Sequence, residues 1–125
     1  MAGTIVADTI QDGAGNSTSM DNAIYGSAKA WVTMGTANTI LASYNVSSVT
    51  LGSTTRTVNF TNAMSNANYA YTGSGCDTSN GLRIYTASSG GTKTTTQIVL
   101  NNVYANNSVT NPSGESFQFA VFGNQ

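Results

Sequence analysis

The chain has 125 residues, of which only 7% are charged, and its formal net charge is −1 with no histidine. This length indicates one domain with a single modest hydrophobic core. So few and balanced charges exclude a basic surface for nucleic acid or for an anionic membrane, and no stretch is apolar enough for membrane insertion as a spanning helix.

Small polar residues take the place of the missing charge, with 19 Thr, 15 Ser and 15 Asn in the chain. The branched Cβ of Thr fits the pleated surface of a strand. Asn and Ser favour turns because their side chains hydrogen bond the local backbone, and the 13 glycines add further turn positions. The composition therefore indicates an all-β protein with many turns.

The N-terminal part predicts an extended arm. Residues 3–10 read GTIVADTI, with Ile5 and Val6 as apolar anchors, and residues 12–22 are rich in Gly, Ser and Asn without an apolar period. We therefore expect an N-terminal arm and linker over 1–22 and a β-sandwich domain over 23–125.

Short segments of that domain alternate between apolar and polar residues, as strands do. In chain order they are 27–34, 40–44, 48–51, 55–60, 68–72, 82–87, 94–101 and 116–122. The alanines of the first segment leave a short helix possible there. Turns or loops are expected at 52–54, 62–66, 73–81, 88–93 and 102–114. The predicted fold is an antiparallel β-sandwich or small barrel of about seven or eight short strands, with 116–122 as a central strand.

Five strings, taken as a set, resemble a known family. They are GTIVADTIQ at 3–11, SAKAWV at 27–32, SYNVSSVT at 43–50, TVNFTNAMSNANYAYT at 57–72 and FAVFGN at 119–124. The set is similar to the small C-terminal module of tail-fibre and other minor structural proteins of tailed phages, especially phages of marine bacteria. The resemblance covers most of the chain, and 73–115 is the least matched part.

The resemblance implies a β-rich virion protein, a homotrimer, that contributes to attachment at the host surface and is made in the host cytoplasm. We expect its arm to be anchored to other virion proteins through Ile5, Val6 and Ile10. Such modules usually end a long fibre, whereas this sequence begins at Met1 without a shaft. An excised domain and a short protein that decorates the capsid both stay open.

Catalysis is not expected. Without histidine, neither a Ser-His-Asp nor a Cys-His site can form. Asp77 and Glu115 are the two acids outside the arm and could form a glycosidase pair, but solvated loop acids are the favoured interpretation. No cofactor or metal site is expected either, since the sequence has no cysteine pair and no calcium-binding loop.

Recognition by the surface is the remaining function. Loops on a rigid β scaffold commonly carry binding, so we expect receptor contacts, with a host glycan or protein, from residues of the three longest loops: Asp77, Asn80, Lys93 and Asn106. Four aromatic residues could stack on a sugar, but core or subunit-interface positions are favoured for them: Trp31, Tyr69, Tyr71 and Tyr85. A carbohydrate-binding module is therefore a third candidate beside the tail-fibre module and the decoration protein.

Overall fold

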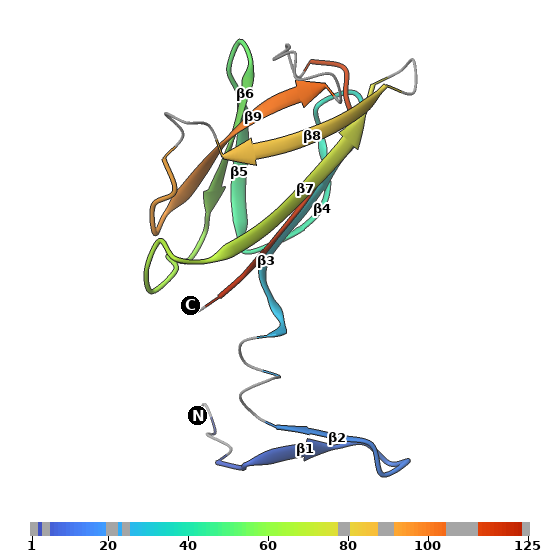
Figure 1. Ribbon diagram of the computed structural model, residues 1–125, viewed down its shortest axis with the longest axis vertical. Helices are drawn as coiled ribbons and strands as arrows, with labels where there is room; N and C mark the ends of the chain where they lie inside the picture. The colour runs from blue at the N-terminus through green and yellow to red at the C-terminus, as the bar shows by residue number, and fades with distance from the viewer. Residues whose placement is uncertain are drawn as a thin grey trace.

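The computed structural model describes residues 3, 6–19, 23, 26–77, 81–87, 92–104 and 113–123, with Tyr104 described by its backbone alone. Over these ranges the protein is built from strands (Figure 1). A separate hairpin pairs β1 (Thr9–Gln11) with β2 (Ser17–Ser19). The other strands are β3 (Ala28–Met34), β4 (Ile40–Tyr44), β5 (Val46–Leu51), β6 (Thr55–Phe60), β7 (Ala70–Cys76), β8 (Leu82–Ala87), β9 (Gln97–Tyr104) and β10 (Phe117–Phe122).

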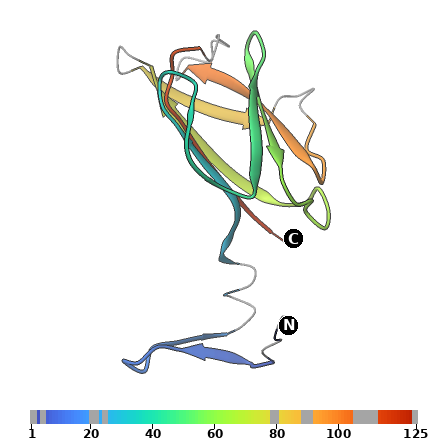
Figure 2. The ribbon, with the colours of Figure 1, turned by 180° about the vertical axis from the view of Figure 1, so that it is seen from behind.

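The eight strands from β3 to β10 form one antiparallel sheet in the order β4-β3-β10-β7-β8-β9-β6-β5. The sheet curls into a nearly closed barrel (Figures 1 and 2). The predicted all-β antiparallel class is thus confirmed, and of the two predicted architectures the barrel describes the sheet. β10 lies between β3 and β7, which confirms the prediction of a central strand at 116–122.

A single residue, Asn45, joins the two edges of this sheet. β4 and β5 stand at opposite ends of the strand order, yet only Asn45 separates them in the chain. Its φ is +52°, a left-handed conformation that Asn tolerates better than most residues. Its side-chain amide donates to the carbonyl oxygens of Lys29 and Asn62, both at 3.1 Å, and its Oδ1 accepts from the Asn62 backbone N–H at 2.7 Å. Asn45 therefore ties both edges of the barrel together at one end.

The barrel interior is filled by the alternate residues of its strands. β3 buries Ala30, Val32 and Met34, and β10 buries Phe117, Phe119 and Val121. The remaining buried apolar side chains are Val46, Val58, Phe60, Met64, Tyr69, Tyr85, Ile98 and Leu100. Period-two alternation thus directs one face of most of these strands into a single core, whereas every residue of β4 is exposed.

The predicted loop at 73–81 is wrong over its first four residues, which belong to β7. Glycine was taken as a turn signal, but here it permits close packing within the sheet. A Cβ on Gly75 would lie 2.0 Å from the carbonyl oxygen of Ser116, and one on Gly73 would lie 3.2 Å from the Tyr85 Cβ. β7 can lie against β10 and under Tyr85 only because these positions carry no side chain.

The strand predicted at 94–101 lies three residues later, as β9. Thr94 starts a turn in which its Oγ1 accepts hydrogen bonds from the backbone N–H groups of Thr96 and Gln97, at 3.2 and 3.0 Å. Local bonds of this kind compete with strand pairing. The strand continues through Asn102, within the predicted 102–114 loop, because Asn102 pairs with Tyr85 of β8 and its side chain is buried.

The arm is more ordered than a linker. The predicted loop at 12–22 includes β2, and the Asp12 Oδ1 closes the intervening turn by accepting from the N–H groups of Ala14 and Asn16, both at 2.9 Å. The two views agree that the hairpin lies apart from the barrel (Figures 1 and 2). Val6 and Ile10 are exposed, whereas Ile5 lies outside the described residues. Their predicted anchoring role stays a prediction.

Candidate functional site

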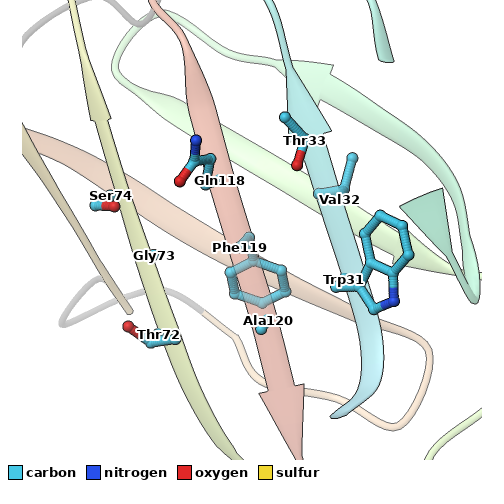
Figure 3. A pocket seen from close by; sticks show the side chains of 9 residues that line it. All are labelled: Trp31, Val32, Thr33, Thr72, Gly73, Ser74, Gln118, Phe119 and Ala120. Atoms are coloured by element: carbon cyan, nitrogen blue, oxygen red, sulfur yellow. The ribbon is translucent and has the colours of Figure 1, made fainter. Parts of the chain in front are cut away.

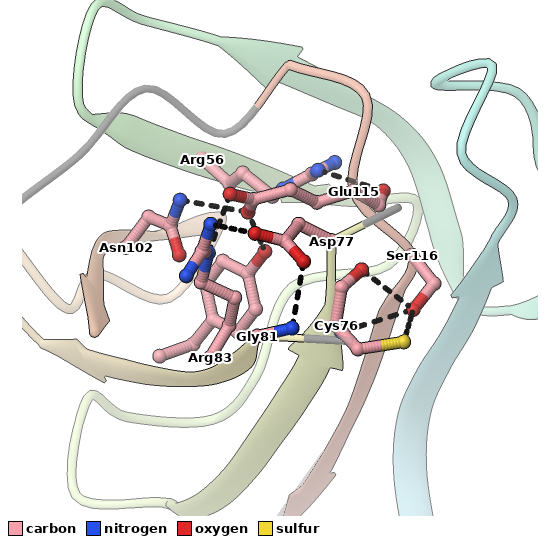
Figure 4. A network of polar contacts seen from close by, with 9 residues as sticks. Arg56, Cys76, Asp77, Gly81, Arg83, Asn102, Glu115 and Ser116 are labelled. Atoms are coloured by element: carbon pink, nitrogen blue, oxygen red, sulfur yellow. Dashed lines mark hydrogen bonds and ion pairs between the residues drawn. The ribbon is translucent and has the colours of Figure 1, made fainter. Parts of the chain in front are cut away.

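Four charged or polar side chains are buried together at one end of the barrel: Arg56, Arg83, Asn102 and Glu115. Arg56, Arg83 and Asn102 come from β6, β8 and β9, and Glu115 comes from the segment before β10 (Figure 4). Arg83 Nε donates to Glu115 Oε1 at 2.6 Å, and Arg83 Nη2 donates to Asp77 Oδ2 at 2.7 Å. One guanidinium therefore bridges the only two acids outside the arm.

Glu115 is the centre of this network. Its Oε2 accepts from Tyr85 Oη at 3.0 Å and from Asn102 Nδ2 at 2.7 Å, and its backbone oxygen accepts from Arg56 Nη2 at 3.2 Å. The expectation that Glu115 is a solvated loop acid is therefore wrong, since its side chain is 2% exposed. A buried carboxylate is tolerated here because charged and neutral donors surround it.

The positive and negative charges of this network balance, and few charged side chains remain for the surface. It contains two of the four basic and two of the five acidic side chains of the protein. Arg56 also lies over the rings of Phe117 and Tyr85, 5.0 and 5.7 Å from their centroids. Neither arginine is predicted as an interior residue from the sequence, although each is in phase with core positions, Arg56 with Val58 and Arg83 with Tyr85.

Asp77 was predicted to contact a receptor, and its carboxylate already has partners within the chain. Oδ1 accepts from the Gly81 N–H at 2.7 Å, and Oδ2 binds Arg83. Lys93 has partners as well: its Nζ donates to the Tyr69 carbonyl at 3.1 Å and lies 5.2 Å from the centroid of that ring. Asn80 and Asn106 lie outside the described residues. Receptor binding by these four stays a prediction.

The tyrosines singled out in the sequence belong to the core or its margin. Tyr69 and Tyr85 are 3% and 2% exposed, and burial raises the pKa of each to about 12. Tyr71 is half-buried against the core. Tyr69 Oη donates to the carbonyl oxygens of Thr94 and Gln97, at 3.0 and 3.2 Å. These rings stabilise the barrel.

Trp31 is different, because it faces away from the core. Its neighbours Ala30 and Val32 are fully buried, whereas Trp31 is 38% exposed on the outer face of β3. Directly across on β4 lies Tyr44, which is 53% exposed. Trp31 therefore does not occupy a core position within one protomer. The other favoured position, at a subunit interface, stays a prediction.

A groove of about 240 Å³ runs beside Trp31 across the outer face of β3, β10 and β7 (Figure 3). Ala120 of β10 is paired with Trp31 on one side and with Thr72 on the other, so a methyl group lies between larger side chains. The outward side chains along the groove are Trp31, Thr33, Thr72, Ser74, Gln118 and Ala120. They come from three strands that are far apart in the sequence.

The polar side chains of this groove are available to a ligand. Within the described part of the chain, no hydrogen bond engages the side chains of Thr33, Thr72, Ser74 or Gln118. Among the residues that the structure describes, none with a charged side chain lines the groove. The site therefore combines one large exposed aromatic ring with neutral donors and acceptors, which suits binding and offers no acid, base or nucleophilic pair.

Exposed Cys76 has its Sγ 3.3 Å from Ser116 Oγ. Among the described residues, no group of three or more His, Cys, Asp and Glu could hold a metal ion, and no helix is both long and apolar enough to cross a membrane.

Comparisons with known proteins give no relative from which a site could be transferred. Neither the protein-family models, nor the curated proteins, nor the solved structures contain a match to this chain.

Proposed function

We propose that this protein is a virion module of the tail-fibre type that attaches a phage particle to the surface of its host. The observation that carries the proposal is the outer groove, which has a neutral lining and an exposed Trp31. Arg83, Asp77 and Glu115 of the same barrel are instead paired with one another. Attachment by such a module needs a rigid scaffold with an exposed recognition face and no chemistry.

The proposal includes a homotrimer held to the particle by its arm. In a symmetric trimer three weak sites act together, so avidity rises without any new contact within a site. The separate β1–β2 hairpin, with exposed Val6 and Ile10, supports docking of the arm on another virion protein, because an isolated two-stranded hairpin is marginally stable at best.

Three experiments test these statements. Gold-labelled antibody against the protein, imaged on phage particles, is expected at the tail; label spread over the capsid lattice would support a decoration protein instead. Fluorescently labelled full-length protein is expected to bind intact host cells. A solution mass equal to one 12.9 kDa chain would contradict the trimer.

The groove also favours a second candidate, a carbohydrate-binding module that is not part of a particle. An exposed tryptophan with neutral polar neighbours suits a sugar wherever the protein is located. Saccharide binding without any antibody label on particles would favour this candidate over the virion module.

A further inference from the structure

We infer that the outer groove binds an uncharged saccharide, with a sugar ring packed on Trp31 and its hydroxyl groups bonded to Gln118 and to the hydroxyls across the groove. This inference adds the chemical class of the ligand to the site of the proposed function. It rests on that function only for the location of the saccharide, the host surface. A subunit interface and an anionic polymer are the alternatives that the test below distinguishes.

Trp31 provides the apolar surface that such a ligand needs. One face of a pyranose ring presents C–H bonds, which carry partial positive charge and pack on the negative face of an aromatic ring. The indole is held beside the groove because β3 is paired on both sides, by β4 and β10. Figure 3 shows its ring standing at the β3 side of the groove, clear of Gln118.

The rest of the groove provides the complementary hydrogen bonds. The Gln118 amide has donors and an acceptor, and each hydroxyl of Thr33, Thr72 and Ser74 can donate or accept. None of these side chains is bonded within the described residues. A sugar carries the same mixture of donors and acceptors on neighbouring carbons, whereas an apolar partner would leave these groups buried without partners.

The neutral lining selects the class of saccharide. No acidic or basic side chain in the described part of the chain borders the groove, and Lys29, two residues before Trp31, donates its Nζ to Ser27 Oγ at 2.8 Å. A sulfated or carboxylated polymer would be desolvated there without a paired cation, which is unfavourable. The geometry therefore points to a neutral glycan.

The site is longer than one sugar. Tyr44, Trp31, Ala120 and Thr72 are successive cross-strand partners on four neighbouring strands. With strands about 4.8 Å apart, this row spans about 14 Å. An oligosaccharide that crosses the strands would contact both exposed aromatic rings, so Tyr44 is expected to contribute to affinity.

Trp31 is the only tryptophan in the sequence, so tryptophan fluorescence reports on this site alone. The test is fluorescence titration of the full-length protein with neutral dextran, mannan, galactan and β-glucan, beside sulfated dextran and alginate. We expect at least one neutral polymer to shift Trp31 emission to the blue and to protect it from acrylamide quenching at least twofold. The sulfated and carboxylated polymers are expected to leave it unchanged.

Three variants locate the site, each first shown to retain the wild-type circular dichroism spectrum. Gln118→Ala and Tyr44→Ala are expected to weaken binding of that polymer at least fivefold. Leu82→Ala is the matched control, since Leu82 is exposed on β8 away from the groove, and it should bind as wild type does. Equal weakening by all three variants would overturn the site.

The other outcomes are decisive as well. No response to any neutral polymer, or a stronger response to the anionic ones, overturns the inference. A blue shift that grows with protein concentration without sugar means that copies of the chain cover this face, which also overturns it. If Gln118→Ala still binds host cells, the groove is not the attachment site, but the proposed attachment is not contradicted. If the wild-type protein responds to saccharide in the titration but does not bind host cells, attachment alone is refuted.

Discussion

Two groups of polar side chains lie on opposite faces of the barrel wall and come from different strands. Inside the barrel, Arg83, Glu115 and Asn102 are buried and bonded to one another. On the outer face, Gln118 and its neighbours have the same hydrogen-bonding capacity with no partner among the described residues. Polar groups with internal partners hold the fold, and polar groups without them are free to bind a ligand, so mutations in the two regions should affect different measurements.

The largest effect is expected from Glu115→Ala. Removing this carboxylate leaves the buried Arg83 without its shorter ion pair and frees Tyr85 Oη and Asn102 Nδ2. Breaking such a buried pair from one side costs about 3–5 kcal/mol. Urea unfolding would measure the loss, and Glu115→Gln, which keeps the size and an acceptor, should lose less. A loss below about 1 kcal/mol would show that the interior network does not hold the fold.

Gly75→Ala should have the next largest effect. The new methyl group would meet the Ser116 carbonyl at 2.0 Å, so β7 and the segment before β10 must separate. Overpacking of this kind costs about 1–3 kcal/mol. The adjacent Ser74→Ala is the control, because Ser74 faces outward, and its thermal unfolding should match that of the wild type. Equal stability of the two variants would contradict the close approach.

Alkaline pH should weaken the interior of the barrel. Burial raises the pKa of Tyr69 and Tyr85 from 10.0 to about 12, so the folded state keeps both protonated where the unfolded state begins to ionise. Their contribution to the free energy of unfolding is therefore complete below pH 10 and is lost between pH 10 and 12. Denaturant titrations across this range test it, and Tyr85→Phe should reduce the slope. The same slope in that variant would exclude Tyr85 as a source.

The smallest change in stability is expected from Trp31→Ala. The indole is 38% exposed and packs outside the core, so the free energy of unfolding should change by about 0.5 kcal/mol or less. Binding to host cells should nevertheless be lost. Loss of more than about 2 kcal/mol in the same unfolding assay would place Trp31 among the residues that hold the fold. Interior and outer-face mutations would then not differ in their effect on stability.

Most of the strands could be predicted from the sequence, because alternation is a local property. The predictions at 55–60 and 82–87 match β6 and β8, and the face of Trp31 opposite Val32 follows from the same period. The predicted strand boundaries are misplaced where a residue distant in the sequence determines how far the strand extends. β7 extends through Gly73 and Gly75 because of Tyr85 and Ser116, and β9 extends to Asn102 because of β8. No local pattern contains those contacts.

Composition and alternation are sufficient to indicate an all-β chain of short strands, poor in charge and without the histidine that many hydrolytic sites need. The inward orientation of Arg83 and the outward orientation of Leu82 and Ile84 depend on the three-dimensional fold. The physical reason is that a period of two assigns residues to two faces without saying which is the interior, and says nothing about which strands become neighbours. Glu115 meets Tyr85 across thirty residues of chain because both side chains lie inside the barrel. The groove joins β3, β10 and β7 because these strands are neighbours in the sheet.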